Sequence, residues 1–258
     1  MENISPKSPA DFFKEFEKIV KENDVNNTEE NFLRRFLIGH HYDIFAALKS
    51  VQNYESFIHR HKETWLHLKR SQIEKVMSSQ IVEVLEKTGL QDQLILWIRL
   101  DNWDPQYTTA DEILQVSGVL CELVYLKYKD VKNIDIILDL NNLSLKHIYG
   151  LSPKFAKRMV FFMSECLPMY MLHIYVVRQP KIFYLVYSLF KPFLEENIRK
   201  SIKICGWNFE VLLVTIGKDN LPVELDGLGD DLDPNRWLKL FYKKKNQIYL
   251  QKLGYEFF

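Results

Sequence analysis

Three short apolar runs alternate with helical segments in the middle of this chain, and this alternation constrains the fold most strongly. The runs cover residues 94–100, 134–140 and 170–177. A helix is predicted after the first run, because Thr109 and Glu112 form a capping box. Ser152 and Pro153 start another helix, which runs to Met163, and a fourth strand is predicted over 209–216. Strands that alternate with helices indicate an α/β domain with a largely parallel sheet.

The first 75 or so residues carry only helical signals. Ser8 and Pro9 mark the start of one helix, Thr28 opens a second, and Asp43 caps a third. A further helix is predicted over 71–87. The chain is therefore predicted to contain a helical module over 1–75, an α/β domain over 76–230, and a tail over 231–258 that packs on the body.

A helix predicted over 180–202 is apolar nearly all round in its first half. One stripe with helical spacing is Phe183, Val186, Tyr187 and Phe190, and the opposite face carries Ile182, Leu185 and Leu189. Pro192 removes a backbone hydrogen bond and is expected to kink this helix. A helix without a polar face is either buried in a core or covers something apolar as a lid, and spacing alone leaves both interpretations open.

Charge and cysteine content exclude several classes of protein. Lys+Arg and Asp+Glu are equal at 34 each, so the composition does not indicate nucleic-acid binding. The three cysteines have neither metal-site spacing nor an even disulfide framework, which favours a reducing, cytoplasmic compartment. The first residues lack the pattern of a signal peptide. We therefore expect a cytoplasmic protein without a membrane span.

Motifs of common enzymes are missing from the sequence. No strand is followed by a glycine-rich phosphate loop or by a G-x-S-x-G elbow. The histidine pairs at 40–41 and 59–61 lack nearby cysteines or clustered acids, so surface or capping roles are favoured over metal binding. Asp135 and Asp139 share one face of a strand; acid–base chemistry is one interpretation, and hydrogen bonding to neighbouring backbone is the simpler one. We expect no enzymatic activity, cofactor or metal.

Large apolar residues, several of them methionines, are concentrated between residues 155 and 190. Methionine side chains adapt to irregular surfaces. The concentration is explained either by an ordinary core or by the lining of a lipid site.

Six motifs follow one another along residues 28–229: FLRRFL from Phe32, NWDP from Asn102, ILDLNN from Ile137, LSPKFAKRM from Leu151, QPKIFYLVYSLFKPFL from Gln179 and LPVELDG from Leu221. In this order and spacing they resemble the CRAL-TRIO (Sec14-like) family of lipid-binding proteins. The resemblance is greatest to the α-tocopherol transfer and retinaldehyde-binding branch of that family.

The resemblance implies a carrier that encloses one hydrophobic lipid, similar to tocopherol, a retinoid or a carotenoid, between a sheet floor and a mobile gate helix. The carrier would be a cytoplasmic monomer that contacts membranes transiently during transfer. Ser117 or Tyr175 would orient a polar group of the ligand. The implied lipid-binding residues are Leu114, Ser117, Cys121, Ile134, Ile136, Leu138, Phe155, Met159, Phe162, Met163, Leu167, Met169, Met171, Ile174, Phe183, Val186, Leu189 and Phe190.

The chain departs from this family where phosphoinositide-responsive members carry basic pairs. Tyr170 and Leu172 occupy the positions of the first pair, and Asn197 and Ser201 those of the second. The cations that could replace them are Arg199, Lys200 and Lys203. A phospholipid or phosphoinositide sensor therefore stays an alternative to the carrier, as does an adaptor that binds a partner protein.

Overall fold

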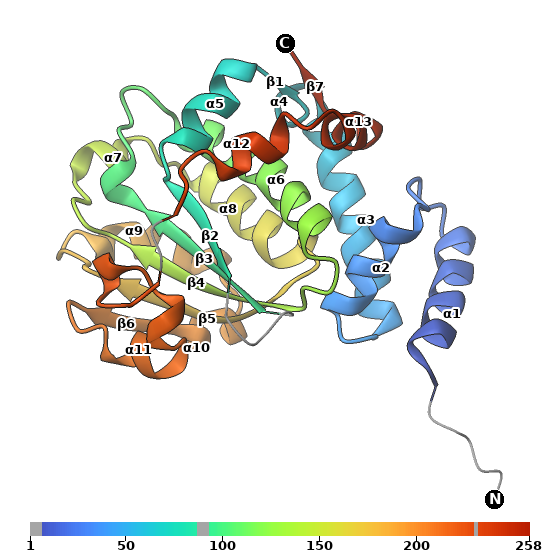
Figure 1. Cartoon of the computed structure of the whole chain (residues 1–258), viewed down its shortest axis with the longest axis horizontal. Helices are drawn as coiled ribbons and strands as arrows, with labels where there is room; N and C mark the ends of the chain where they lie inside the picture. The colour runs from blue at the N-terminus through green and yellow to red at the C-terminus, as the bar shows by residue number, and fades with distance from the viewer. Residues whose placement is uncertain (1–6, 87–92, 230–231) are drawn as a thin grey trace, which may run out of the picture.

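A five-stranded sheet forms the centre of the computed structural model, which describes residues 7–86, 93–229 and 232–258 (Figure 1). The strands lie in sequence order: β2 (Val82–Glu86), β3 (Gln93–Arg99), β4 (Asn133–Asp139), β5 (Tyr170–Val177) and β6 (Ile202–Gly206). β2 is antiparallel to β3, and the other neighbours are parallel. The predicted α/β class with a largely parallel sheet is confirmed.

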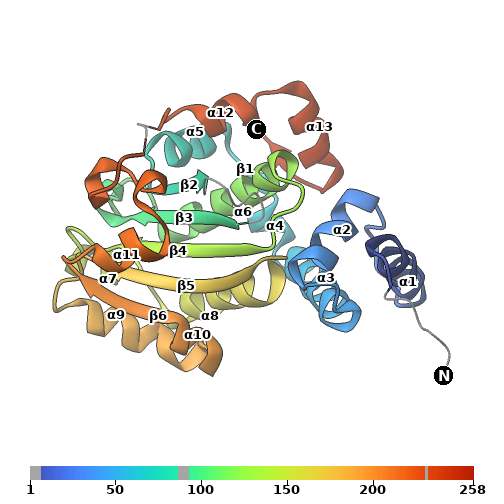
Figure 2. The same cartoon turned by 60° about the horizontal axis from the view of Figure 1, so that its bottom comes forward.

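The order of the strands places the connecting helices on one face of the sheet. Each connection from β3 to β6 moves one step in the same direction, and right-handed crossovers of this kind put their helices on the same side. These helices are α6 (Ala110–Lys127), α7 (Leu145–Tyr149), α8 (Pro153–Phe161), α9 (Phe183–Phe190) and α10 (Glu196–Ser201). The opposite face is covered by α11 (Glu210–Thr215), which lies across the strands from α8 in Figure 2.

The fourth parallel strand is not where the sequence pattern predicted it. Residues 209–216 contain the helix α11, and the strand is β6, at the end of the segment predicted as one helix over 180–202. That predicted helix is two short helices, α9 and α10, separated by a 3₁₀ turn that contains Pro192. A short apolar run fits the periodicity of a helix as well as that of a strand. Residues 202–206 form a strand because they pair with β5.

The helix predicted over 71–87 is also shorter than expected. α5 (Arg70–Ser78) ends before Gln80, whose backbone is left-handed with φ of 54°. The chain then continues as β2, in which Val82 and Val84 face one side and Glu83 the other. Pairing of β2 with β3 overrides the good helix propensity of this segment.

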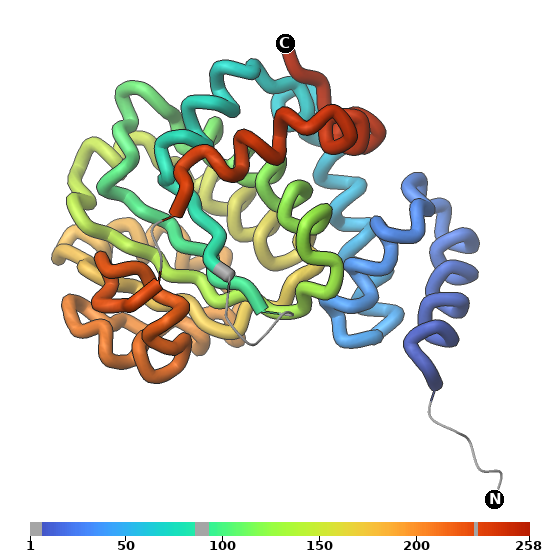
Figure 3. Tube along the Cα trace, in the orientation of Figure 1, coloured from blue at the N-terminus to red at the C-terminus, as the bar shows by residue number. Residues whose placement is uncertain are grey.

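The two ends of the chain pack against the same body. The N-terminal helices are α1 (Pro9–Glu22), α2 (Glu30–Gly39), α3 (Ile44–Arg60) and α4 (Lys62–Trp65), and the C-terminal ones are α12 (Arg236–Phe241) and α13 (Lys244–Lys252). β1 (His67–Leu68) pairs with β7 (Glu256–Phe257), so the last strand lies beside the N-terminal segment (Figure 3). One apolar core includes residues from both ends and from the α/β part. The division into three domains stays a prediction.

A buried ion pair joins these parts behind α6. Arg35 of α2 contacts Glu122 of α6 through two nitrogens, at 2.5 and 3.1 Å, and each residue is 3% exposed. The hydroxyls of Tyr54 and Tyr249 donate to the same carboxylate at 2.8 and 3.4 Å. Because an unpaired buried charge is costly, these contacts fix α2, α3 and α13 against α6.

Candidate functional site

The floor of the site is one face of the sheet. Side chains alternate between the two faces of a strand, and every second residue of β2 to β5 faces a cavity of about 300 Å³. Eleven strand residues form this floor: Val82, Val84, Leu94, Leu96, Ile98, Ile134, Ile136, Leu138, Met171, Ile174 and Val176. A β-bulge between β4 and β5 shifts the register at Asp135, so Leu172 is skipped and Met171 and Ile174 both face the cavity.

Helices supply the walls and the cover. α6 contributes a stripe with helical spacing, which includes Leu114, Ser117 and Cys121. α8 and the segment after it contribute Phe155, Met159, Met163, Leu167 and Met169. The cover comes from residues 183–202, through Phe183, Val186, Tyr187, Phe190, Leu194, Ile198 and Ile202.

The lining contains no Asp, Glu, Lys, Arg, His, Asn or Gln among the described residues. Its serines and its tryptophan donate their hydrogen bonds within the protein. Ser117 Oγ donates to the Ile113 carbonyl at 2.8 Å, and Ser164 Oγ to the Val160 carbonyl at 2.6 Å. Trp103 Nε1 donates to the Thr108 carbonyl at 2.7 Å. A charged ligand group would lose its hydration here without a charged partner, so the cavity suits an apolar molecule.

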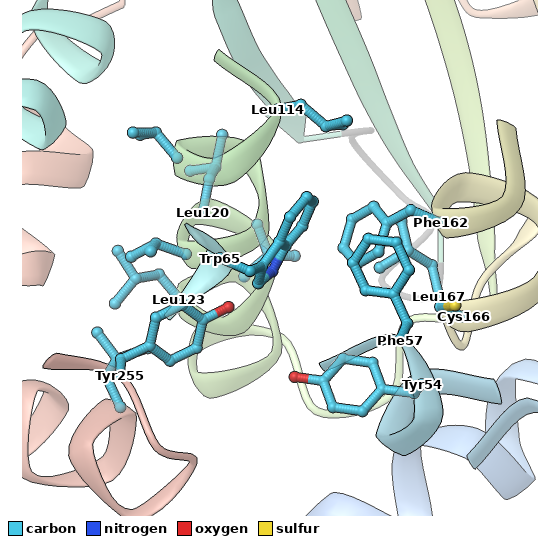
Figure 4. Packing of buried hydrophobic residues seen from close by; sticks show 14 of the residues in the cluster. Tyr54, Phe57, Trp65, Leu114, Leu120, Leu123, Phe162, Cys166, Leu167 and Tyr255 are labelled. Carbon is cyan, nitrogen blue, oxygen red and sulfur yellow. The ribbon is translucent and has the colours of Figure 1, made fainter. Parts of the chain in front are cut away.

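All but two of the lipid-binding residues predicted from the sequence line this cavity; Phe162 and Leu189 do not. Phe162 packs in the core against Phe57 and Trp65, with ring centroids 5.1 and 4.7 Å apart (Figure 4). It begins a π-helical turn over Phe162–Cys166, which widens the helix and changes the direction of its side chains. Leu189 lies beside the inward stripe of α9, and Tyr187 faces the cavity instead. Tyr187 could have been found from the sequence, because it lies four residues after Phe183 and therefore on the same face of the helix.

Tyr175, predicted to orient a ligand, lies away from the cavity, and Cys121, predicted in its wall, is chemically inert. Tyr175 belongs to the opposite face of the sheet, where its hydroxyl donates to Thr215 Oγ1 at 3.0 Å. Cys121 does face the cavity, but burial raises the pKa of its thiol to about 12. A protonated thiol is a poor nucleophile, so Cys121 is part of an apolar wall.

The paired aspartates are buried on the face opposite the cavity. Asp135 accepts hydrogen bonds from Gln93 Nε2 at 2.7 Å and from His173 Nδ1 at 3.1 Å. Asp139 forms a two-point pair with Arg178, in which the Nε–Oδ1 distance is 2.9 Å. The simpler expectation, bonding to neighbouring backbone, holds only for the Asn141 N–H on Asp139. The main partners are side chains of adjacent strands, and neither aspartate lines the cavity.

The three candidate cations for a phosphoinositide have different surroundings. Lys200 pairs with Glu196 at 2.7 Å on the exposed face of α10, and Arg199 is exposed beside it. Lys203 lies over the ring of Tyr175, 5.2 Å from its centroid, on the far face of the sheet. Among the described residues, no cluster of His, Cys, Asp and Glu could hold a metal ion. None of the described helices is long and apolar enough to cross a membrane.

The start of the covering segment is tied to the last residue of β6. Arg178, with φ of 51°, donates its N–H to the Gly206 carbonyl at 2.7 Å. Gly206, with φ of 66°, donates its own N–H to Gln179 Oε1 at 3.1 Å. Residues 179–201 therefore form a flap that leaves the sheet at Arg178, which we call the hinge, and rejoins it at Ile202, the first residue of β6.

Comparison with known proteins agrees with this architecture. The model of the CRAL/TRIO domain family matches residues 78–227. The alpha-tocopherol transfer protein-like protein of Homo sapiens is 28% identical over 210 residues, which cover 81% of this chain and 61% of that protein. Clavesin-1 of Xenopus laevis is 24% identical over 215 residues, covering 82% and 65%. The chain thus spans about three fifths of the length of the curated relatives it matches.

A solved structure, the crystal structure of Sfh5, has the same fold. It aligns with a TM-score of 0.58 at 14% identity and covers 98% of this chain and 99% of that chain.

Proposed function

This chain belongs to the CRAL/TRIO domain family, and we propose that it is a non-enzymatic carrier of one hydrophobic lipid, held between the sheet and α9. Candidate ligands are lipids similar to tocopherol, a retinoid or a carotenoid, and the name of the human relative supports the first of these. The observation that carries the proposal is the lining of the cavity, which holds no charged or amide side chain among the described residues.

Burial of apolar surface supplies the affinity. At ~25 cal/mol per Å², a lipid that buries roughly 400 Å² of apolar surface gains about 10 kcal/mol before the costs of association. A small hydroxyl or carbonyl on the ligand finds few partners, chiefly Tyr187 and the Ser117 oxygen, which can still accept a hydrogen bond. The site is therefore selective by size and shape, with few polar contacts.

Transfer requires that the flap over 179–201 opens, because it covers the cavity. Its outer surface is also apolar: Tyr184 is 59% exposed and Leu185 is 60% exposed, both on α9. An apolar outer face is unfavourable in water and favourable against a bilayer. We infer that α9 contacts the membrane when lipid is taken up or released.

The direct test is to identify what the purified protein carries. Organic extracts of the full chain are analysed by mass spectrometry, and the extracted protein is then titrated with tocopherol, retinol, β-carotene, phosphatidylcholine and a phosphatidylinositol phosphate. We expect one apolar lipid per chain and saturable binding of at least one isoprenoid. Saturation only by the phosphatidylinositol phosphate would favour the sensor instead. Failure of every lipid to bind would overturn the proposal.

Two adjacent residues of α9 provide a matched pair of variants. Val186 lines the cavity, whereas Leu185 points outward. Val186→Asn places an amide without a partner against the lipid, and we expect at least a tenfold rise in Kd, since such burial costs about 1–3 kcal/mol. Leu185→Asn should leave Kd in solution within about twofold and slow transfer to vesicles. Equal effects of the two changes on Kd would contradict the assignment of the inner face.

A further inference from the structure

A second apolar surface lies on the side of the sheet away from the cavity. It consists of Trp207, Val211 and Val214, which are 70%, 42% and 78% exposed, and we call it the α11 surface. The inner side of α11 is already used, because Leu212 and Ile216 are 0% and 2% exposed in the core beneath the sheet. The helix is thus apolar both toward the core and toward solvent, which no packing need of the described chain explains.

Trp207 differs from every other tryptophan of the chain. Trp65, Trp97, Trp103 and Trp237 are between 1% and 7% exposed. A tryptophan ring combines a large apolar body with one N–H donor, so its favoured places are a core, a protein interface or the boundary between lipid and water. The described chain provides neither of the first two for Trp207.

The α11 surface adjoins the flap at its hinge. Gly206, at the end of β6, holds the start of the flap through its bonds to Arg178 and Gln179, and Trp207 is the next residue. β6 ends at this point, and its Ile204 is 50% exposed. Figures 1 and 2 both place α9, β6 and α11 on the same side of the molecule. The apolar outer face of α9 and the α11 surface therefore lie on the same side of the molecule, on opposite faces of the sheet.

The charges along the segment that carries this surface balance. Residues 203–219 contain Lys203 and Lys218 against Glu210 and Asp219. A surface that bound an anionic headgroup or a charged protein by electrostatics would carry an excess of one sign. An apolar surface with an interfacial tryptophan and no net charge instead matches the boundary of a zwitterionic bilayer.

We propose that the α11 surface inserts into the boundary region of a phospholipid bilayer and anchors the fixed body of the protein there while α9 moves. This inference rests on the proposed function, since an anchor beside the hinge has a role only if lipid passes between the cavity and a membrane. The body of the protein is then already bound to the bilayer when the flap opens, and Trp207 lies on the part that does not move.

The single exposed tryptophan makes the test direct. Full-length protein is mixed with phosphatidylcholine vesicles that carry a bromine-labelled acyl chain, and tryptophan fluorescence is recorded. We expect quenching and a blue shift of the exposed component, unaffected by added salt and lost in Trp207→Phe. Val214→Ser should weaken vesicle binding about tenfold, the loss expected for one buried valine side chain. The matched control is Phe45→Ser, because Phe45 is also 78% exposed but lies on α3.

Three outcomes would overturn the proposal. The first is that vesicles leave Trp207 unquenched although lipid is still loaded and transferred, which refutes the anchor and keeps the carrier. The second is that Phe45→Ser and Val214→Ser weaken vesicle binding equally. The third is dimerisation in light scattering that Val214→Ser abolishes, without vesicle binding, which assigns the surface to a second copy of the chain. Loss of lipid loading in the unaltered protein would refute the carrier itself.

Discussion

The two faces of the central sheet are built from alternate residues of the same strands, yet their chemistry is opposite. On the cavity face, Ile134, Ile136 and Leu138 of β4 line an apolar space. On the other face, Asp135 and Asp139 alternate with them and are 2% and 0% exposed. That second face is filled by α11 and by the segment around Leu221 and Leu225. Two successive side chains of β4 therefore face different surroundings: one faces an apolar cavity and the next faces a packed, charged layer.

The difference shows what each kind of surface tolerates. A buried carboxylate needs partners at fixed positions, and losing one of them leaves an uncompensated charge. The groups that surround Asp135 and Asp139 must therefore stay at fixed positions. An apolar wall has no hydrogen bonds to lose, so it can face a ligand, another side chain or a small void with modest changes in energy. The charged face depends on fixed partners, and the apolar face does not.

The largest expected effect comes from breaking the charged face. Asp139→Ala leaves the largely buried guanidinium of Arg178 without its partner, and we expect a loss of about 3–5 kcal/mol in the free energy of unfolding. The neighbouring Leu138→Ala removes the same number of non-hydrogen atoms but enlarges a space that already exists, so about 2 kcal/mol is expected. Urea denaturation of both variants measures the two losses. A greater loss for Leu138→Ala would reverse the assigned roles of the two faces.

A smaller effect is expected from adding volume to each face. Ile137 is fully buried in the packed layer, and Ile136 faces the cavity. Ile137→Phe should cost about 1–3 kcal/mol of stability, because that layer has no room for the ring. Ile136→Phe should cost less than 1 kcal/mol and lower the capacity for lipid, since the ring occupies the cavity. Thermal unfolding and lipid titration check both variants, and equal lipid capacity in the two would exclude the cavity as the binding site.

The smallest expected effect is slow chemical labelling of the Cys121 thiol, which lines the cavity. Burial raises the pKa of Cys121 to about 12, so very little of this thiol is ionised at pH 8. Because only the thiolate reacts, labelling by N-ethylmaleimide should be slow and should rise about tenfold per pH unit up to that pKa. Bound lipid should slow it further. Cys205 lies on the opposite face, and its rate should not respond to lipid. Mass spectrometry of the labelled peptides distinguishes the two, and lipid protection of Cys205 alone would contradict the location of the site.

Local signals were sufficient for much of the fold. The Asp43 side chain caps α3, and Thr109 and Glu112 form the capping box of α6, as the sequence predicts. The strands at 94–100, 134–140 and 170–177 are β3, β4 and β5 to within a residue. In each case residues close in sequence determine the conformation, so a pattern read along the chain is adequate.

The sequence-based predictions fail where contacts between residues distant in the sequence determine the conformation. β6 and α11 are adjacent apolar segments of similar length, and only the pairing of Ile202–Gly206 with β5 makes the first one a strand. The same holds for β2, which pairs with β3. The family resemblance placed Phe162 among the lipid-binding residues, but Phe162 does not line the cavity. It lies in the core because Phe57 and Trp65, about a hundred residues earlier, occupy the space next to it.

The methionines of the wall carry a further consequence. Four of the six methionines of the chain, Met159, Met163, Met169 and Met171, line the cavity. Oxidation of a thioether to the sulfoxide makes a flexible apolar group polar and chiral. The lining offers such an oxygen almost no donors, so each oxidised residue would draw water into the site or disturb its packing. Lipids prone to peroxidation would bring oxidants to these sulfur atoms, whereas a reducing cargo would shield them. On the proposed function, the redox state of the bound lipid therefore determines how readily the methionines of the cavity wall are oxidised.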